Sequence, residues 1–174
     1  MTPAQIETFK KILSAPDLQI FTRPEWGAQN ESHRELIRSF VSVLKISPDT
    51  KLSISHTQGM GLVAINSSSV GVDIEVSRRV TPATVARISR EEEVKAAPSP
   101  AALWCAKEAA FKALRDFTQP PVVSKITIGD WQKIDSQLET FKIFNFAELS
   151  APQNGLGLLA SFSPYTYAFF VFPS

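Results

Sequence analysis

The sequence predicts an α+β fold, and three patterns carry that prediction. Residues 32–44 place apolar side chains at helical spacing, residues 51–76 contain three short strand-like runs, and residues 156–172 contain two continuous apolar runs. Helices followed by strands, in this order twice along the chain, are typical of α+β proteins. With 174 residues, 44% of them hydrophobic, the chain is long enough for a single domain with a sizeable core.

The composition excludes several classes of protein. A formal net charge of +1 argues against a general nucleic-acid binder, although it leaves room for a local basic pocket that receives an anionic ligand. The single cysteine, Cys105, excludes an internal disulfide and a metal site made of thiolates. The first residues, MTPAQIETFKKIL, lack the apolar core of a signal peptide, and no apolar run is long enough to span a membrane. We therefore expect a soluble, cytoplasmic protein that binds neither nucleic acid nor membrane.

Two amphipathic helices are predicted in the first part of the chain. The first begins after Thr2, which forms a capping box with Gln5, and Pro3 suits its first position. The second begins near Ser32, which is paired with Glu35 in the same way. Their apolar faces comprise Ile6, Phe9 and Leu13 in the first helix, and Leu36, Ile37, Phe40, Val41 and Leu44 in the second. The segment SAPDLQIFTRPEWGAQN between them is predicted to be a connector.

Three strands are predicted next, in the runs KLSISHT, GLVAIN and VGVDIEV. The turn sequences QGMG and NSSS separate them, which predicts a three-stranded antiparallel meander. Thr81 and Pro82 then open a short helix that we expect to reach about Arg90. Ser99 and Pro100 open another helix in the same way, and it contains the stretch LWCAKEAAFKAL. Four further strands are predicted in the runs VVSKITI, FKIFNF, LGLLASF and YTYAFFVF, of which the last two read as buried on both faces.

Two acidic residues on the strand VGVDIEV are the first candidates for chemistry. Asp73 and Glu75 are two residues apart, so their side chains leave the same face of a strand, while Val72 and Ile74 face a core. Two carboxylates this close raise each other's pKa unless a cation lies between them, and a hard divalent ion with oxygen ligands suits that position. The alternative is an exposed acidic pair on an edge strand with no special role.

The helix LWCAKEAAFKAL carries a second candidate set. Trp104, Glu108 and Lys112 are four residues apart and form a ridge on the helix beside an apolar stripe. Glu108 and Lys112 are either an ordinary helix-stabilising ion pair or two parts of an active site. Spacing alone favours the ordinary pair.

Taken together, these stretches resemble the 4′-phosphopantetheinyl transferase family. Its signature is an apolar-Gly-apolar-Asp strand, followed later by an aromatic residue, Ser/Cys/Thr, any residue, Lys-Glu, a small residue, two spacers and Lys. Residues 70–73 (VGVD) and 104–112 (WCAKEAAFK) match these two parts in the family's order. The Asp-x-Glu form and the upstream Ser55-His56 are similar to the larger, monomeric surfactin-synthetase-activating (Sfp-like) branch, of which this chain looks like a compact member.

The resemblance implies a single domain of two similar α+β halves, residues 1–69 and 70–174, related by a pseudo-two-fold axis. The site is expected in the cleft between the halves. Because one chain contains both halves, we expect a monomer. The resemblance covers about residues 32–112 well and the rest of the chain less closely.

The resemblance also implies an activity. Family members transfer 4′-phosphopantetheine from coenzyme A to a serine of an acyl or peptidyl carrier protein and release adenosine 3′,5′-bisphosphate. Asp73, Glu75 and Glu108 would bind Mg²⁺ together with the pyrophosphate of coenzyme A. Glu108, or a water on the metal beside it, would accept the proton of the carrier serine. Lys112 would bind phosphate and stabilise the leaving bisphosphate.

Further residues match positions that contact coenzyme A in the family. Ser55 and His56 correspond to the Ser-His pair that meets its phosphates, although a histidine at a strand end is also commonly structural. Arg34 matches a position near the nucleotide, and its alternative is a solvated helix charge. Lys107 belongs to the motif, where a phosphate contact and a structural salt bridge both fit. Trp104 and Phe111 are interpreted as packing residues.

A cluster of arginines follows the acidic strand, and it is a candidate docking patch for an acidic carrier protein. The alternative is a set of solvated charges beside the acidic run 91–93. The cluster comprises Arg78, Arg79, Arg87 and Arg90.

The sequence departs from the family at three places. The Gly-Lys-Pro loop before the Ser-His strand is absent, and Lys51 is only a loose substitute for its lysine. The interval between Asp73 and Trp104 is short, and glycines that commonly follow the last motif lysine are replaced by ALRDFTQPP. Two other functions therefore remain as alternatives: a non-catalytic module that binds coenzyme A or a carrier, and a metal-dependent pyrophosphohydrolase that acts on coenzyme A.

Overall fold

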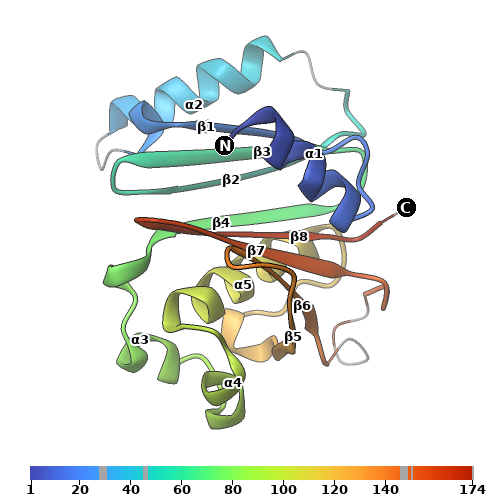
Figure 1. The fold of residues 1–174 in the computed structure, drawn as a ribbon. Helices are drawn as coiled ribbons and strands as arrows, with labels where there is room; N and C mark the ends of the chain where they lie inside the picture. The colour runs from blue at the N-terminus through green and yellow to red at the C-terminus, as the bar shows by residue number, and fades with distance from the viewer. Residues whose placement is uncertain (28–30, 45–46, 146–148, 150, 174) are drawn as a thin grey trace.

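Two antiparallel sheets stacked between helices form the fold (Figure 1). The computed structural model describes residues 1–27, 31–44, 47–145, 149 and 151–173, apart from the side chains of residues 31–34. The first sheet has the order β1-β3-β2, with β1 Gln19–Arg23, β2 Lys51–Thr57 and β3 Met60–Asn66. The second has the order β4-β8-β7-β6-β5, with β4 Val70–Val76, β5 Ile128–Lys133, β6 Leu138–Ile143, β7 Leu156–Phe162 and β8 Tyr165–Val171. The α+β prediction is confirmed.

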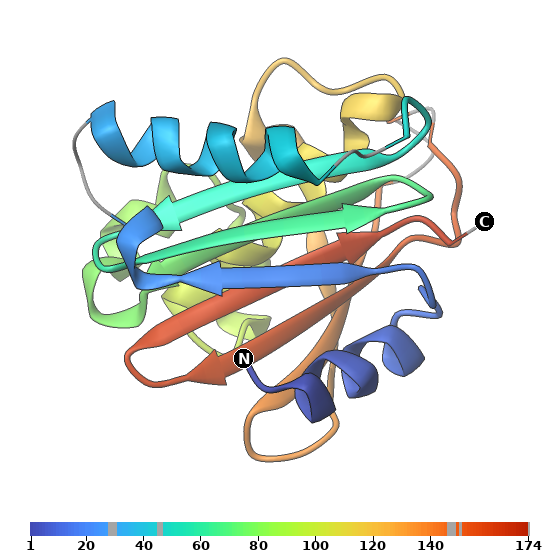
Figure 2. The same ribbon diagram turned by 90° about the horizontal axis from the view of Figure 1, so that it is seen from above.

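The helices lie on the outer faces of the two sheets, except the first helix, which lies beside the first sheet (Figure 1 and Figure 2). They are α1 Pro3–Ile12, α2 Glu31–Val43, α3 Pro82–Ala86, α4 Glu91–Ala96 and α5 Pro100–Ala113. Helix α2 lies on the outer face of the first sheet, and α3, α4 and α5 lie below the second (Figure 1). Seen from above, α1 lies beside the first sheet (Figure 2). Its Phe9 packs its ring against Phe162 and Phe169 of the second sheet. Among the helices of the described residues, none has both the length and the apolar character needed to cross a bilayer.

Several predicted elements are confirmed because their signals are local. Helix α1 has the predicted capping box between Thr2 and Gln5, with Pro3 in its first turn. Ser99 caps α5 through a bond from the Ala102 amide. The turn between β2 and β3 contains Gly59 at a φ of +78°, a conformation that glycine adopts without strain. Strands β7 and β8 match the two predicted apolar runs.

The predicted meander is wrong at its third strand. β2 and β3 pair as expected, but β4 leaves that sheet and pairs with β8 at the other end of the chain. The turn sequence NSSS therefore leads the chain from one sheet to the other. A local turn signal cannot specify this, because the partner strand lies about a hundred residues further on.

Other boundaries also differ from the predictions. Strand β1 lies inside the segment that was predicted to be a connector. It was not predicted, because the alternation of a five-residue strand is too short to be distinctive. The helix expected to reach Arg90 ends at Ala86, and α4 is a separate helix that the sequence analysis missed. Strand β5 begins only at Ile128, since a short 3₁₀ turn, Val123–Lys125, occupies the middle of the predicted run.

A row of hydroxyl groups joins the two sheets where β2 meets β4, and we call this contact the seam. Ser53 Oγ accepts a hydrogen bond from the Val72 amide at 3.0 Å, and Ser55 Oγ accepts one from the Ile74 amide at 3.4 Å. Because these contacts advance together along both strands, β2 and β4 run in the same direction. Side-chain hydroxyls here take the place of a backbone ladder between two edge strands.

Gly71 allows α5 to lie directly on β4. A β-carbon at Gly71 would lie 1.9 Å from the Ala109 carbonyl oxygen and 2.4 Å from the Ala113 amide nitrogen, far inside contact distance. The glycine therefore sets the approach of α5 to the strand that carries Asp73.

Replacing Gly71 by alanine is expected to destabilise the protein, because the added methyl group forces α5 away from β4. Overpacking of this kind costs about 1–3 kcal/mol, and the clash with backbone atoms places this variant at the upper end. Urea denaturation of both proteins measures the difference. A variant as stable as the wild type would show that α5 shifts without cost and would contradict this account.

Candidate active site

The predicted acidic residues meet where β2, β4 and α5 come together. Val72 and Ile74 are buried in the core between the sheets, while Asp73 and Glu75 leave β4 on the opposite face, toward α5. Helix α5 is buried along most of its surface, and its partly exposed positions include Trp104, Glu108 and Lys112. All three residues of the predicted ridge are thus among the partly exposed residues of α5.

Asp73 is the most constrained of these residues and is only 5% exposed. Its Oδ1 accepts a hydrogen bond from Ser55 Oγ at 2.7 Å and forms an ion pair with Lys112 Nζ at 2.8 Å. Its Oδ2 is buried and has no hydrogen-bond partner among the described residues. A buried oxygen without a partner is costly, and the buried Cys105 thiol, whose pKa is raised by burial and then by the charge of Asp73, lies near this carboxylate.

Lys112 reaches across to β4. Besides the ion pair with Asp73, its Nζ donates to the Val72 carbonyl oxygen at 3.0 Å. Within the described part of the chain, no ion pair joins Lys112 to Glu108. Glu108 and Lys112 therefore do not form the ordinary helix-stabilising ion pair that their four-residue spacing would allow.

Glu75 and Glu108 both have raised pKa values. Burial raises the pKa of Glu75 most, the hydrogen bond from Thr57 lowers it, and the charge of Asp73 raises it again. Burial is also the largest cause of the raised pKa of Glu108, followed by repulsion from Asp73, while Lys112 lowers it. Glu75 and Glu108 therefore both lie close enough to Asp73 for its charge to disfavour theirs, which a bound cation would relieve.

Replacing Glu108 by glutamine is expected to raise the melting temperature of the free protein modestly at about pH 8. The pKa of Glu108 is higher in the folded state than its ordinary 4.5, so folding favours the protonated form and the ionised form costs stability above that folded-state pKa. The neutral amide removes this cost. Below the ordinary pKa both states of the wild type are protonated, so the advantage disappears. Thermal unfolding of the variant and the wild type, once above the folded-state pKa of Glu108 and once below its ordinary pKa, measures this difference. A variant that melts at a lower temperature than the wild type at the higher pH would contradict the prediction.

The donor set fits Mg²⁺ in its chemistry. Magnesium prefers carboxylate oxygens, uses few of them, and completes its shell with phosphate and water. Asp73 supplies a buried oxygen without a partner among the described residues, and Glu75 and Glu108 supply further carboxylates nearby. As they stand, no three His, Cys, Asp or Glu side chains of the described residues form a group that could hold a metal ion.

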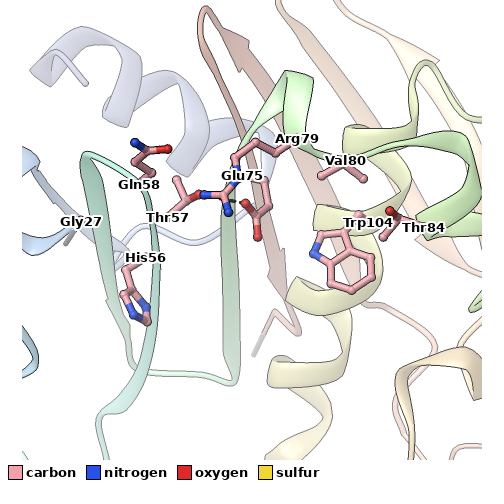
Figure 3. A pocket seen from close by; sticks show the side chains of 9 residues that line it. All are labelled: Gly27, His56, Thr57, Gln58, Glu75, Arg79, Val80, Thr84 and Trp104. Carbon is pink, nitrogen blue, oxygen red and sulfur yellow. Dashed lines mark hydrogen bonds between the residues drawn. The ribbon is translucent and has the colours of Figure 1, made fainter. Parts of the chain in front are cut away.

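A pocket of about 350 Å³ opens at one of the three carboxylates, Glu75, whereas Asp73, Glu108 and Lys112 do not line it (Figure 3). Glu75 and Trp104 stand on facing walls of it, one from β4 and one from α5. His56 is exposed and lines the pocket, pointing away from Thr57 and Glu75 (Figure 3). Its lining comprises Gly27, His56, Thr57, Gln58, Glu75, Arg79, Val80, Thr84 and Trp104.

Of two further residues at this site, Thr57 was missed by the sequence analysis, and Arg79 was considered only for carrier docking. Thr57 Oγ1 donates to Glu75 Oε2 at 2.9 Å, and Arg79 lines the pocket and lowers the pKa of Glu75 by its charge. The alternation of Ser53, Ser55 and Thr57 along β2 is the one signal that pointed to a shared face of hydroxyls.

The residues predicted to contact coenzyme A lie in different surroundings. Ser55 is buried and bonded to Asp73, whereas His56 is exposed at the pocket. Lys107 is fully buried on the core side of α5, where its Nζ pairs with Glu93 at 2.8 Å and donates to the Ile126 carbonyl oxygen. This geometry favours the structural salt bridge over the phosphate contact for Lys107. Arg34 belongs to α2, and its side chain lies outside the described part of the structure.

The basic residues considered for docking are exposed but spread over more than one hollow. Arg79 lines the pocket beside Glu75, whereas Arg90 lines a separate groove along β5. Lys51, the loose substitute for the family's loop lysine, lies 3.9 Å from Asp116 Oδ1. Arg78 and Arg87 are exposed as well.

The chain was compared with models of protein families and with curated proteins. A family model described as ACPS, 4′-phosphopantetheinyl transferase superfamily, matches residues 69–168. No curated protein matches the chain. The matched span covers more than half of the chain and contains β4 and α5 with their acidic residues and Lys112, while the first sheet, with β2 and the seam hydroxyls, lies before it.

Proposed function

Since the chain belongs to the 4′-phosphopantetheinyl transferase superfamily, we propose that it transfers 4′-phosphopantetheine from coenzyme A to a serine of an acyl or peptidyl carrier protein. The reaction would depend on Mg²⁺ and release adenosine 3′,5′-bisphosphate. One observation supports this most: Asp73, Glu75, Glu108 and Lys112 gather where β4 meets α5, inside the span that the family model matches. A pure binding module has no need of three carboxylates and a lysine at one place.

Asp73, Glu75 and Glu108 would hold the metal ion. When bound, Mg²⁺ would neutralise the charge of the coenzyme A pyrophosphate, whose phosphoanhydride bond breaks as the phosphopantetheinyl phosphate passes to the carrier serine. Asp73 would offer its free Oδ2, while its Oδ1 stays bonded to Ser55. Burial is the largest cause of the raised pKa values of Glu75 and Glu108, and repulsion from Asp73 raises both further, which supports the assignment of the three carboxylates as a cation site.

Glu108 is the proposed general base, and Lys112 the proposed phosphate-binding cation. Burial raises the pKa of Glu108, which strengthens it as an acceptor for the proton of the carrier serine. Lys112 Nζ, held at Asp73 and the Val72 carbonyl, is placed beside the carboxylates, where it would bind the phosphate of the leaving group. His56, exposed at the pocket, would meet the 3′-phosphate of coenzyme A.

The partner proteins follow from the same proposal. Carrier proteins are acidic, and the exposed arginines after β4, among them Arg78 and Arg79, would receive such a surface. The chain would act as a monomer in the cytoplasm, and membership of the Sfp-like branch belongs to the same proposal.

Intact mass spectrometry of an apo carrier protein tests the function. The carrier is incubated with the protein, coenzyme A and Mg²⁺, beside a reaction without carrier and one with excess chelator. A mass gain of one phosphopantetheine group that chelation abolishes supports the transferase. Coenzyme A cleaved without a carrier would instead identify the pyrophosphohydrolase. Bound coenzyme A with no gain across fatty-acid, polyketide and peptide carriers would identify the binding module.

A further inference from the structure

We propose that Thr57 and Ser55 are positioning residues, whose hydroxyl groups hold Glu75 and Asp73 in place as metal-binding carboxylates. Both come from β2, in the first sheet, and act across the seam on carboxylates of the second sheet. The inference rests on the proposed function for the metal ion and for the role of Asp73 and Glu75 as its ligands. It assigns the first sheet, which the family match does not include, a part in building the site.

The direction of the Ser55 hydrogen bonds is determined by its neighbours. Its Oγ lies 3.4 Å from the Ile74 amide nitrogen, which can only donate, so the oxygen accepts there. The hydroxyl proton is then free to point at Asp73 Oδ1, 2.7 Å away. With Lys112 on the same Oδ1, Asp73 Oδ2 is left turned away from both partners.

Thr57 makes a corresponding hydrogen bond to one carboxylate oxygen of Glu75. Its Oγ1 donates to Glu75 Oε2 at 2.9 Å, and the threonine itself is only 8% exposed. Glu75 is half-buried at the pocket wall, and without this bond its side chain would be free to rotate into the pocket. A hydroxyl bond to one oxygen of a carboxylate fixes its rotamer and leaves the other oxygen for a cation.

The seam also provides a matched control. Ser53 occupies the same face of β2 two residues before Ser55, and it is equally buried. Its Oγ accepts from the Val72 amide and bonds to neither carboxylate. Loss of the Ser53 hydroxyl therefore weakens the seam without touching the metal-binding groups.

The test is a calorimetric titration of the purified protein with MgCl₂, without and with coenzyme A, on the wild type, Thr57→Val, Thr57→Ser and Ser53→Ala. Loss of a group that orients a metal ligand costs about 10- to 100-fold in metal affinity, so Thr57→Val is expected to weaken Mg²⁺ binding at least about tenfold. Thr57→Ser keeps the hydroxyl and is expected to stay within about twofold of the wild type. Ser53→Ala is expected to melt at a lower temperature but to bind Mg²⁺ as the wild type does.

Three results would overturn the inference: wild-type affinity in Thr57→Val, an equal loss in Ser53→Ala, or no Mg²⁺ binding by the wild type in either titration. Failure of the proposed function gives a different result. In that case the wild type binds Mg²⁺ and Thr57→Val binds it more weakly, yet no carrier gains mass.

Discussion

Replacing Asp73 by asparagine lowers the rate of phosphopantetheine transfer by at least about 100-fold if the proposed site is correct, in line with the loss of one preorganised electrostatic group. Asp73 loses its charge, and with it both the attraction that holds Lys112 Nζ at 2.8 Å and the oxygen offered to the metal ion. The asparagine amide has nearly the same shape, so Ser55 keeps a carbonyl oxygen as acceptor. The rate of mass gain on the carrier protein measures the effect.

Asp130 supplies the matched control for that experiment. It forms an ion pair with Lys142 at 2.9 Å on the surface of the second sheet, far from the candidate site in the order of strands. Asp130 has a φ of +51°, which asparagine also tolerates, so Asp130→Asn removes one carboxylate with no added strain. We expect Asp130→Asn to transfer at the wild-type rate. Transfer by Asp73→Asn within threefold of the control, with about the same melting temperature, would rule out the metal site at Asp73.

Replacing Lys107 by methionine is expected to lower the free energy of unfolding by about 3–5 kcal/mol, the usual cost of removing one partner of a buried ion pair. Glu93 is the centre of this network. Its Oε1 accepts from Lys107 and from the Ile128 amide at 2.8 Å each, and its Oε2 accepts from the Arg90 amide at 2.9 Å. Without Lys107, a carboxylate that is almost fully buried remains with no counter-charge.

Lys95 is the control here, since it pairs with Glu91 on the same short helix α4 but at the surface, where both side chains are mostly exposed. Lys95→Met is expected to cost at most about 0.5 kcal/mol, because exposed pairs contribute little. Urea denaturation of both variants and of Lys107→Met with Glu93→Gln compares the pairs, and the double variant should recover part of the loss. Unchanged stability of Lys107→Met together with a raised KM for coenzyme A would favour the phosphate contact instead.

The elements predicted correctly are those that short stretches of sequence specify. Thr2, Pro3 and Gln5 determine the start of α1 through contacts within one turn, and the runs that became β7 and β8 are apolar throughout. Strand β4 was recognised as a strand but assigned to the wrong sheet, because its partner β8 lies at the far end of the chain. No short stretch of the sequence indicates which distant strand β4 pairs with. The pseudo-two-fold relation of the two halves stays a prediction.

In the candidate site, too, some features could be predicted from short stretches of sequence and others could not. Asp73, Glu75, Glu108 and Lys112 were selected from two short motifs, and the fold brings them together. The contact between Thr57 and Glu75 could not be predicted, since it depends on how two sheets meet. Likewise, the residue spacing of α5 suggested a pair between Glu108 and Lys112, but the position of β4 gives the lysine a different partner.

The seam also bears on how the protein behaves in concentrated solution. Edge strands recruit strands from other molecules and so start aggregation. β2 and β4 are edges of two different sheets, and the fold turns them toward each other, so each covers the other. If the seam opened, both edge strands would be exposed at the same time and could pair with strands of other molecules. Ser53 and Ser55, which accept hydrogen bonds from β4 amides, therefore help to keep both edges covered.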